Sequence, residues 1–208
     1  MTDAVGRPEL VRRGLWLNYL TIGYNTIEAL VSLAAGLVAG SVALIGFGVD
    51  SAIEVTASLA AQWRLRSDHS ERRERAEQVT RRVIGGSFVA LAVYVTADSA
   101  MTLWYREAPR PSLVGLVILS LSVLVMPLLA RAKRRVAQAL ASRALEAEAM
   151  QTSVCAYLSV IALAGVALNT ILGWWWADPL AALLMVPLIL LGISVRSREV
   201  PHQRPLPQ

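Results

Sequence analysis

Two acidic side chains stand one helical turn apart within a long apolar stretch. Asp50 and Glu54 have i, i+4 spacing, which on a helix places both carboxylates on the same face. A carboxylate in the middle of a membrane helix costs roughly 2.5–3.5 kcal/mol on insertion scales, so each is a candidate for function. Because two such groups repel unless a cation or a proton lies between them, the pair predicts a cation site. The alternative is a pair that only hydrogen-bonds to neighbouring helices.

A second pair with the same spacing occurs further along the chain. Gln151 and Cys155 are four residues apart at the start of another apolar stretch. If the two helices faced each other, the four side chains would offer a roughly tetrahedral donor set, which first-row divalent metals commonly take. Taken alone, Gln151 is more often a residue that hydrogen-bonds between helices, and Cys155 is more often a small packing residue.

Three more polar side chains within apolar stretches are Asn25, Glu28 and Asp98. They are candidates for a water-filled route or for proton coupling, since ionisable groups inside membrane helices often mark such paths. Glu28 could instead pair with an Asn or Ser of a neighbouring helix. Asp98 lies close enough to the outer end of its stretch to be hydrated.

The elements that carry these residues are expected to be membrane-spanning helices. Hydrophobic residues make up 55% of the 208 residues, and the mean hydropathy is +0.51, which is more apolar content than one soluble core needs. About 20 helical residues cross a hydrocarbon core of about 30 Å. Six stretches meet that length, at 15–37, 42–62, 83–105, 112–130, 151–172 and 177–195. The predicted fold is an all-α bundle of six transmembrane helices over 15–195, flanked by a segment 1–14 and a disordered tail 196–208.

The basic residues predict the orientation. Of the 20 Lys and Arg residues, only Arg106 and Arg110 lie in the three short connections; the others lie near the termini or in the long connections 63–82 and 131–150. By the positive-inside rule, the long connections and both termini are cytoplasmic. Neither long connection contains Gly or Pro, so we expect both to continue as helix. Despite a net charge of +5, their expected partner is anionic lipid headgroups and not nucleic acid.

Several stretches resemble the cation diffusion facilitators, a family of divalent metal transporters. Residues 25–58, which read NTIEALVSLAAGLVAGSVALIGFGVDSAIEVTAS, are similar to the family's first hairpin, with its Gly-Ser-x-Ala-Leu turn and an acidic pair on the second helix. Residues 148–165, EAMQTSVCAYLSVIALAG, are similar to its fifth helix, and ADPLAALL from Ala177 matches the usual start of the sixth. The chain ends soon after the sixth stretch, so we expect a short form without the family's C-terminal cytoplasmic domain.

The resemblance implies a metal site and a transport activity. It assigns Asp50 and Glu54 to the acidic pair of the second helix, and Gln151 and Cys155 to the positions of the His/Asp and Asp ligands of the fifth. Glu54 replaces the usual Asp, and an amide and a thiol replace the usual donors of the fifth helix. The expected activity is export of a divalent transition metal ion as substrate, zinc before cadmium or cobalt, with protons as counter-ion and a homodimer as the usual assembly.

The expected mechanism needs no covalent chemistry. Two carboxylates balance a divalent ion in a medium of low dielectric, and they would take up a proton when the ion leaves. No Ser-His-Asp set, phosphate loop or HExxH motif occurs in the sequence, so an enzyme is not expected. The expected location is the plasma (inner) membrane of a prokaryote. Two alternatives stay open: a non-transporting scaffold or metal-sensing subunit, and a proton-coupled exporter of organic cations that uses Glu28 or Asp98.

Overall fold

The structure is a computed structural model that describes residues 7–65, 70–141 and 143–197. Within these ranges, the side chains of residues 7, 60–65, 70–81, 143, 144, 147 and 192–197 are not described. The described chain is helical almost throughout. Its helices are α1 Arg7–Ala39, α2 Val42–Leu65, α3 Ser70–Tyr105, α4 Leu113–Leu140, α5 Arg143–Leu172 and α6 Ala177–Ser197.

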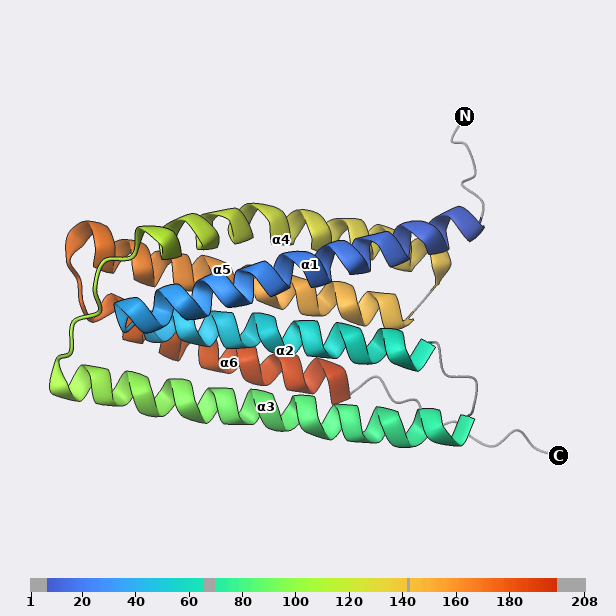
Figure 1. Cartoon of the computed structure of the whole chain (residues 1–208), viewed down its shortest axis with the longest axis horizontal. Helices are drawn as coiled ribbons and strands as arrows, with labels where there is room; N and C mark the ends of the chain where they lie inside the picture. The colour runs from blue at the N-terminus through green and yellow to red at the C-terminus, as the bar shows by residue number, and fades with distance from the viewer. Residues whose placement is uncertain (1–6, 66–69, 142, 198–208) are drawn as a thin grey trace.

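The six helices run alongside one another in one bundle (Figure 1). α1 begins and α6 ends at the same end of the bundle, and the connections α1–α2, α3–α4 and α5–α6 lie at the opposite end. α1 packs against α2 and α4, α5 packs between α4 and α6, and α3 packs against α2 and α6. This is the arrangement expected for an even number of spans, and it confirms the predicted six-helix bundle.

The helices have the length and composition of membrane spans. The described apolar part of α6, Ala177–Leu191, is the shortest, although its helix continues to Ser197. Large apolar side chains cover the outside of the bundle: Leu37 is 72% exposed and Leu113 is 74% exposed. Such a surface fits hydrocarbon and not water. The five longer candidate spans are Pro8–Ala39, Val42–Leu59, Arg82–Tyr105, Leu113–Leu140 and Glu148–Leu172.

The turns occur where the sequence predicts them. Gly40 has a φ of +66° between α1 and α2, and Gly173 has a φ of +68° between α5 and α6, a conformation that glycine adopts without steric cost. Asp178, in the first turn of α6, accepts a hydrogen bond of 2.5 Å from Ser41 and one of 3.5 Å from the backbone of Ala43. One buried carboxylate therefore holds the starts of α2 and α6 together.

The long connections continue as helix, as predicted. α2 extends to Leu65 and α3 already begins at Ser70, while α4 extends to Leu140 and α5 begins at Arg143. Ala141 ends α4 in the left-handed conformation, with a φ of 48°. The side chains of 60–81 lie outside the description, so the predicted headgroup contacts of the first connection stay a prediction. α1 begins before its predicted span.

Close helix packing depends on a few small residues. A Cβ atom on Gly36 would lie 2.8 Å from Cγ1 of Ile45, and one on Gly165 would lie 2.4 Å from Cβ of Ala181. These two glycines therefore let α1 approach α2 and α5 approach α6, as small residues commonly do in membrane bundles. Gly40, in contrast, has open space around it and serves the turn.

We predict that Gly165→Ala destabilises the bundle. The new methyl group cannot fit without moving α6, because Ala181 and the backbone oxygen of Ala177 are both close, and overpacking of this kind costs about 1–3 kcal/mol. The measurement is thermal unfolding in detergent. Gly23→Ala is the matched control, since Gly23 is exposed and no atom lies within 4 Å of its Cβ position. Equal midpoints for the two variants would contradict the proposed close contact.

Candidate cation site

Asp50 is the most exceptional polar group of the bundle interior. It lies in the middle of α2 and is 1% exposed. Among the described residues, neither of its carboxylate oxygens has a hydrogen-bond partner. The neighbouring charges that act on it are those of Glu54 and Glu28, which are also acidic. A buried carboxylate in such surroundings requires a proton or a cation.

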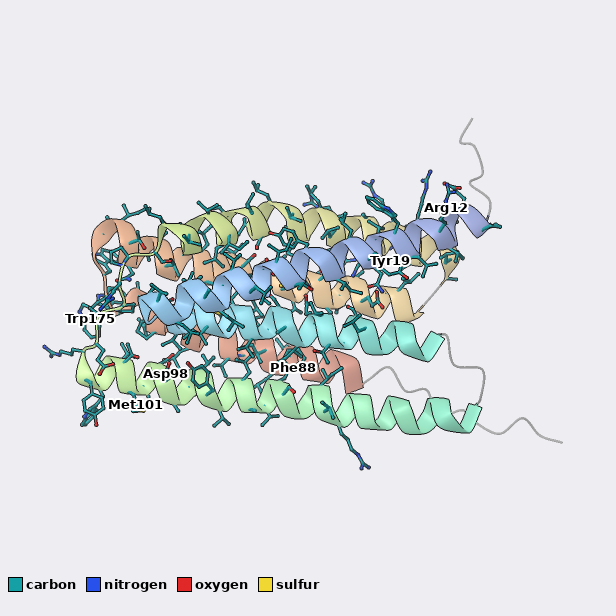
Figure 2. The ribbon with its side chains drawn as sticks, in the orientation of Figure 1. Arg12, Tyr19, Phe88, Asp98, Met101 and Trp175 are labelled. Atoms are coloured by element: carbon teal, nitrogen blue, oxygen red, sulfur yellow. The ribbon has the colours of Figure 1, made fainter. Side chains whose placement is uncertain are left out.

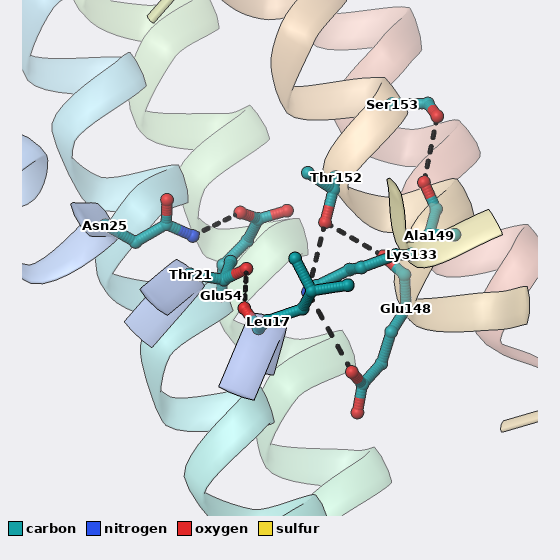
Figure 3. Close-up of polar contacts among 9 residues, drawn as sticks. All are labelled: Leu17, Thr21, Asn25, Glu54, Lys133, Glu148, Ala149, Thr152 and Ser153. Atoms are coloured by element: carbon teal, nitrogen blue, oxygen red, sulfur yellow. Dashed lines mark hydrogen bonds and ion pairs between the residues drawn. The ribbon is translucent and has the colours of Figure 1, made fainter. Parts of the chain in front are cut away.

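Glu54 lies one turn further along the same helix and is 4% exposed. Its Oε2 accepts a hydrogen bond of 2.7 Å from the amide of Asn25 on α1 (Figure 3). The thiol of Cys155, on α5, also donates to Glu54. The carboxylate is thus held from two sides, by α1 and by α5, at the point where three helices meet. Glu54 is thus held in one orientation, and the neighbouring Asp50 carboxylate has no hydrogen-bond partner among the described residues. Such a pair is suited to binding a cation.

The two predicted donors of α5 are placed differently. Cys155 is completely buried, belongs to the apolar core and contacts Glu54. Gln151 is half-buried one turn away, and its Nε2 is buried with no hydrogen-bond partner in the described part of the chain. An amide can turn to present either its oxygen or its nitrogen. Gln151 therefore has an uncommitted polar end.

The predicted four-residue site is not a preformed metal cage. Within the described residues, no three His, Cys, Asp or Glu side chains stand in an arrangement that could hold a metal ion. Asp50 and Glu54 share a helix face, as predicted, and Cys155 reaches Glu54. Completion of the coordination shell would need neutral oxygen donors, water or a small movement of α5 against α2.

Glu28 lies close to the site but is hydrogen-bonded. It is completely buried on α1, and its two oxygens accept hydrogen bonds from Ser51 of α2, at 2.7 Å, and from Ser122 of α4. The hydroxyl groups of Tyr24 and Ser122 are 3.0 Å apart, which extends this network. The predicted pairing of Glu28 with a serine of a neighbouring helix is confirmed. Because its charge also acts on Asp50, Glu28 remains a candidate for proton coupling.

Asp98 is not part of this cluster. It lies on α3 towards the end of the bundle that carries Met101 and Trp175, whereas Arg12 lies at the opposite end (Figure 2). Its Oδ2 accepts a hydrogen bond of 3.1 Å from Tyr94, and the side chain is partly exposed. The described structure therefore does not place Asp98 at this site. The hydrogen bond from Tyr94 explains the polar side chain at this position.

A polar stripe along α1 was not anticipated from the sequence. Its members are buried and recur every three or four residues, which places them on one face over roughly 20 Å of helix. The spacing is visible in the sequence, where it interrupts an otherwise apolar run. Such a stripe is the inverse of a lipid-facing surface and is suited to lining an ion route. Its members are Asn18, Thr21, Asn25, Glu28 and Ser32.

Lys133 is a second feature that sequence reasoning missed. The positive-inside count treats it as one more cytoplasmic cation, but it is only 3% exposed, on the inward face of α4. The signal was present in the sequence, because Lys133 continues a buried stripe that includes Met126, Leu129 and Val136. A lysine in that register is directed inward.

The fold and the site together define a class of protein. Apolar helices long enough to cross a bilayer, with carboxylates buried where they meet, make this a multi-pass integral membrane protein with an interior suited to a cation. The family model described as the cation efflux transmembrane domain matches residues 19–199, and the chain therefore belongs to the cation efflux, or cation diffusion facilitator, family. It is a cation transporter of this type, with a divalent cation as substrate. No curated protein sequence matched the chain.

We predict that Asn25→Leu weakens cation binding. The substitution removes the 2.7 Å hydrogen bond that orients Glu54, and a hydrogen bond to a charged group contributes about 1.5–3 kcal/mol. The dissociation constant for zinc, measured by calorimetry in detergent, should rise about tenfold or more.

Asn169→Leu is the matched control for this experiment. Asn169 is also a buried asparagine, but it lies near the end of α5, well beyond Cys155. Its amide donates to the backbone oxygen of Pro109 at 3.0 Å. Its loss should lower thermal stability and leave the dissociation constant unchanged. An Asn25→Leu protein that binds zinc as tightly as the wild type would show that Asn25 does not orient a ligand.

Proposed function

We propose that this transporter exports divalent transition metal ions, zinc foremost, in exchange for protons. In this proposal, Asp50 and Glu54 supply the charge of the transport site. The observation that carries it is the buried Asp50 carboxylate, whose two oxygens have no hydrogen-bond partner among the described residues. Of the cations that could neutralise the pair, a divalent ion balances both carboxylates at once.

The donor chemistry around the pair favours zinc, cadmium or cobalt. Cys155 offers sulfur and Gln151 offers an amide oxygen, in addition to the two carboxylates. A soft donor beside hard ones shifts preference away from magnesium, calcium and manganese. The contact between Cys155 and Glu54 supports this assignment, because it places the sulfur next to a proposed ligand. Cys155 then selects the metal more than it supplies charge.

Proton exchange follows from the same electrostatics. When the ion leaves, Asp50, Glu54 and Glu28 remain buried and close enough for the charges of Glu54 and Glu28 to act on Asp50, and like charges so placed favour proton uptake. The polar stripe of α1 offers a route from the site along the bundle. Rocking of the helices would open this route alternately to each side, as in other secondary transporters.

The setting of the protein completes the proposal. The location is the plasma (inner) membrane of a prokaryote, with both termini in the cytoplasm. Anionic headgroups contact the arginine-rich connections, whose local enrichment in positive charge attracts such lipids. The assembly is a homodimer, as the family resemblance implies. Stacked Trp174 and Trp176, with ring centroids 5.3 Å apart, lie at the α5–α6 turn and suit the outer membrane interface.

We predict that Asp50→Asn and Glu54→Gln each abolish zinc flux. Each variant removes one of the two charges that balance the ion, while the side-chain volume stays the same. The measurement is zinc uptake into proteoliposomes with an imposed pH gradient, acidic on the inside. Wild-type uptake should increase with the gradient, and both variants should stay at the level of empty vesicles. Glu107→Gln, in the exposed α3–α4 connection, is the matched control and should transport normally.

If zinc flux survived in both variants, the transport site could not be formed by these residues of α2. If wild-type flux did not change with the pH gradient, proton exchange would be wrong, but the proposed metal site would not be affected.

A further prediction concerns selectivity. Cys155→Ser removes the soft donor, so transport of cadmium should fall more than transport of zinc, because cadmium depends more on sulfur. Cys155→Asp should shift the preference towards harder ions such as manganese. Both variants retain Asp50 and Glu54, so flux of some divalent ion should persist. The measurement is competition among cadmium, zinc and manganese in proteoliposomes. An unchanged order of preference in both variants would show that Cys155 only packs.

A further inference from the structure

Lys133 is a charged group in a place where a cation is costly. It lies on α4 and is 3% exposed, and no other basic side chain is buried in the part of the chain that the structure describes. Burial of an ammonium group costs several kcal/mol unless acidic partners compensate it. An apolar residue at this position of the buried stripe of α4 would avoid this free-energy cost. We therefore expect the charge of Lys133 to have a function.

The ammonium group lies near one acidic residue and is acted on by the charge of a second. Its Nζ lies 3.8 Å from Oε2 of Glu148 and 3.4 Å from Oγ1 of Thr152, both on α5. The charge of Glu54 on α2 also acts on it. In Figure 3, the dashed contacts lead from Lys133 to Glu148 and Thr152, and Glu54 of α2 is drawn nearby without a dashed contact to Lys133.

The contacts of Lys133 with Glu148 and Thr152 are long. Charge-assisted hydrogen bonds between an ammonium and a carboxylate are usually about 2.7–2.9 Å, whereas the distances here are 3.4 and 3.8 Å. Neither of these two contacts is short enough to fix the group in one position. A lysine side chain is a point charge on a flexible four-carbon stem, so it is able to move between the direction of Glu148 and the direction of Glu54.

We propose that Lys133 is a tethered counter-cation that competes with the transported metal for Glu54. This inference rests on the proposed function. The structure shows the ammonium group with Glu148 and Thr152. After the metal leaves, the group turns towards Glu54 and neutralises part of its charge. In the loaded site, the metal repels it, and Glu148 and Thr152 receive it. Metal binding and the position of Lys133 are therefore coupled and mutually exclusive at Glu54.

Such a competitor would serve transport by weakening binding. Two carboxylates in a buried site hold a divalent ion tightly, and a carrier must also release it. An internal cation that replaces the metal lowers the free energy of the empty site and so speeds release. The alternative is a purely structural pair, in which Lys133 only links α4 to α5 through Glu148.

The two roles predict opposite effects on affinity. Lys133→Met keeps the length of the side chain but removes the competitor, so zinc should bind about tenfold more tightly and turnover should fall by a similar factor. Glu148→Gln removes the alternative partner, which leaves Lys133 to compete harder, so zinc should bind more weakly. The double variant should bind zinc as tightly as Lys133→Met, because Glu148 acts only through Lys133.

The experiment measures zinc dissociation constants by calorimetry and zinc turnover in proteoliposomes for these three variants. Lys133→Arg should retain most of the wild-type behaviour because it keeps the charge. Arg131→Met is the matched control, since Arg131 is an exposed cation on the same helix, and both of its values should equal those of the wild type.

Tighter binding with slower turnover in Lys133→Met, together with weaker binding in Glu148→Gln, supports the inference. An unchanged or weaker affinity in Lys133→Met overturns it, as does a double variant that binds like Glu148→Gln. Absence of zinc binding by the wild type itself would overturn the proposed function and this inference with it. Normal wild-type binding with an unchanged Lys133→Met affinity would overturn the inference alone.

Discussion

Negative charge buried in a medium of low dielectric is the constraint on which the rest of the bundle depends. Glu28, Asp50 and Glu54 are each at most 4% exposed, although the outside of the bundle faces hydrocarbon. Their cost to folding is several kcal/mol each unless something compensates them. Hydroxyl groups stabilise Glu28, and Asn25 and Cys155 stabilise Glu54. Asp50 has no hydrogen-bond partner among the described residues, which is why we propose it as a ligand of the transported cation.

The helices around the site are arranged to bring compensating groups to these charges. α1 contributes a polar face, α2 carries the acidic pair, and α4 and α5 add Ser122, Lys133 and Cys155 from the other side. Glycines allow the close approach of α1 to α2 and of α5 to α6. At the far end, Asp178 joins the starts of α2 and α6. The fold thus encloses a few polar groups in an otherwise apolar core and keeps the lipid-facing surface apolar.

The sequence predicted the helices and the shared helix face of Asp50 and Glu54, because apolar length and i, i+4 spacing depend on local geometry alone. It also placed short connections between the predicted spans where Gly40 and Gly173 make the turns. It could not show that Cys155 reaches Glu54 or that Ser122 reaches Glu28, because those contacts join residues about 100 positions apart and depend on how the helices rotate. Lys133 was misjudged because a charge count ignores the face on which a residue lies.

The central claim is that a divalent ion binds at Asp50 and Glu54 in the middle of the bundle. Anomalous diffraction at the zinc edge, from crystals of the protein loaded with zinc, tests it most directly. We predict one strong peak inside the bundle, about 2.0–2.2 Å from carboxylate oxygens of both residues. A peak bound only at the surface or in the arginine-rich connections, with none between α2 and α5, would contradict it.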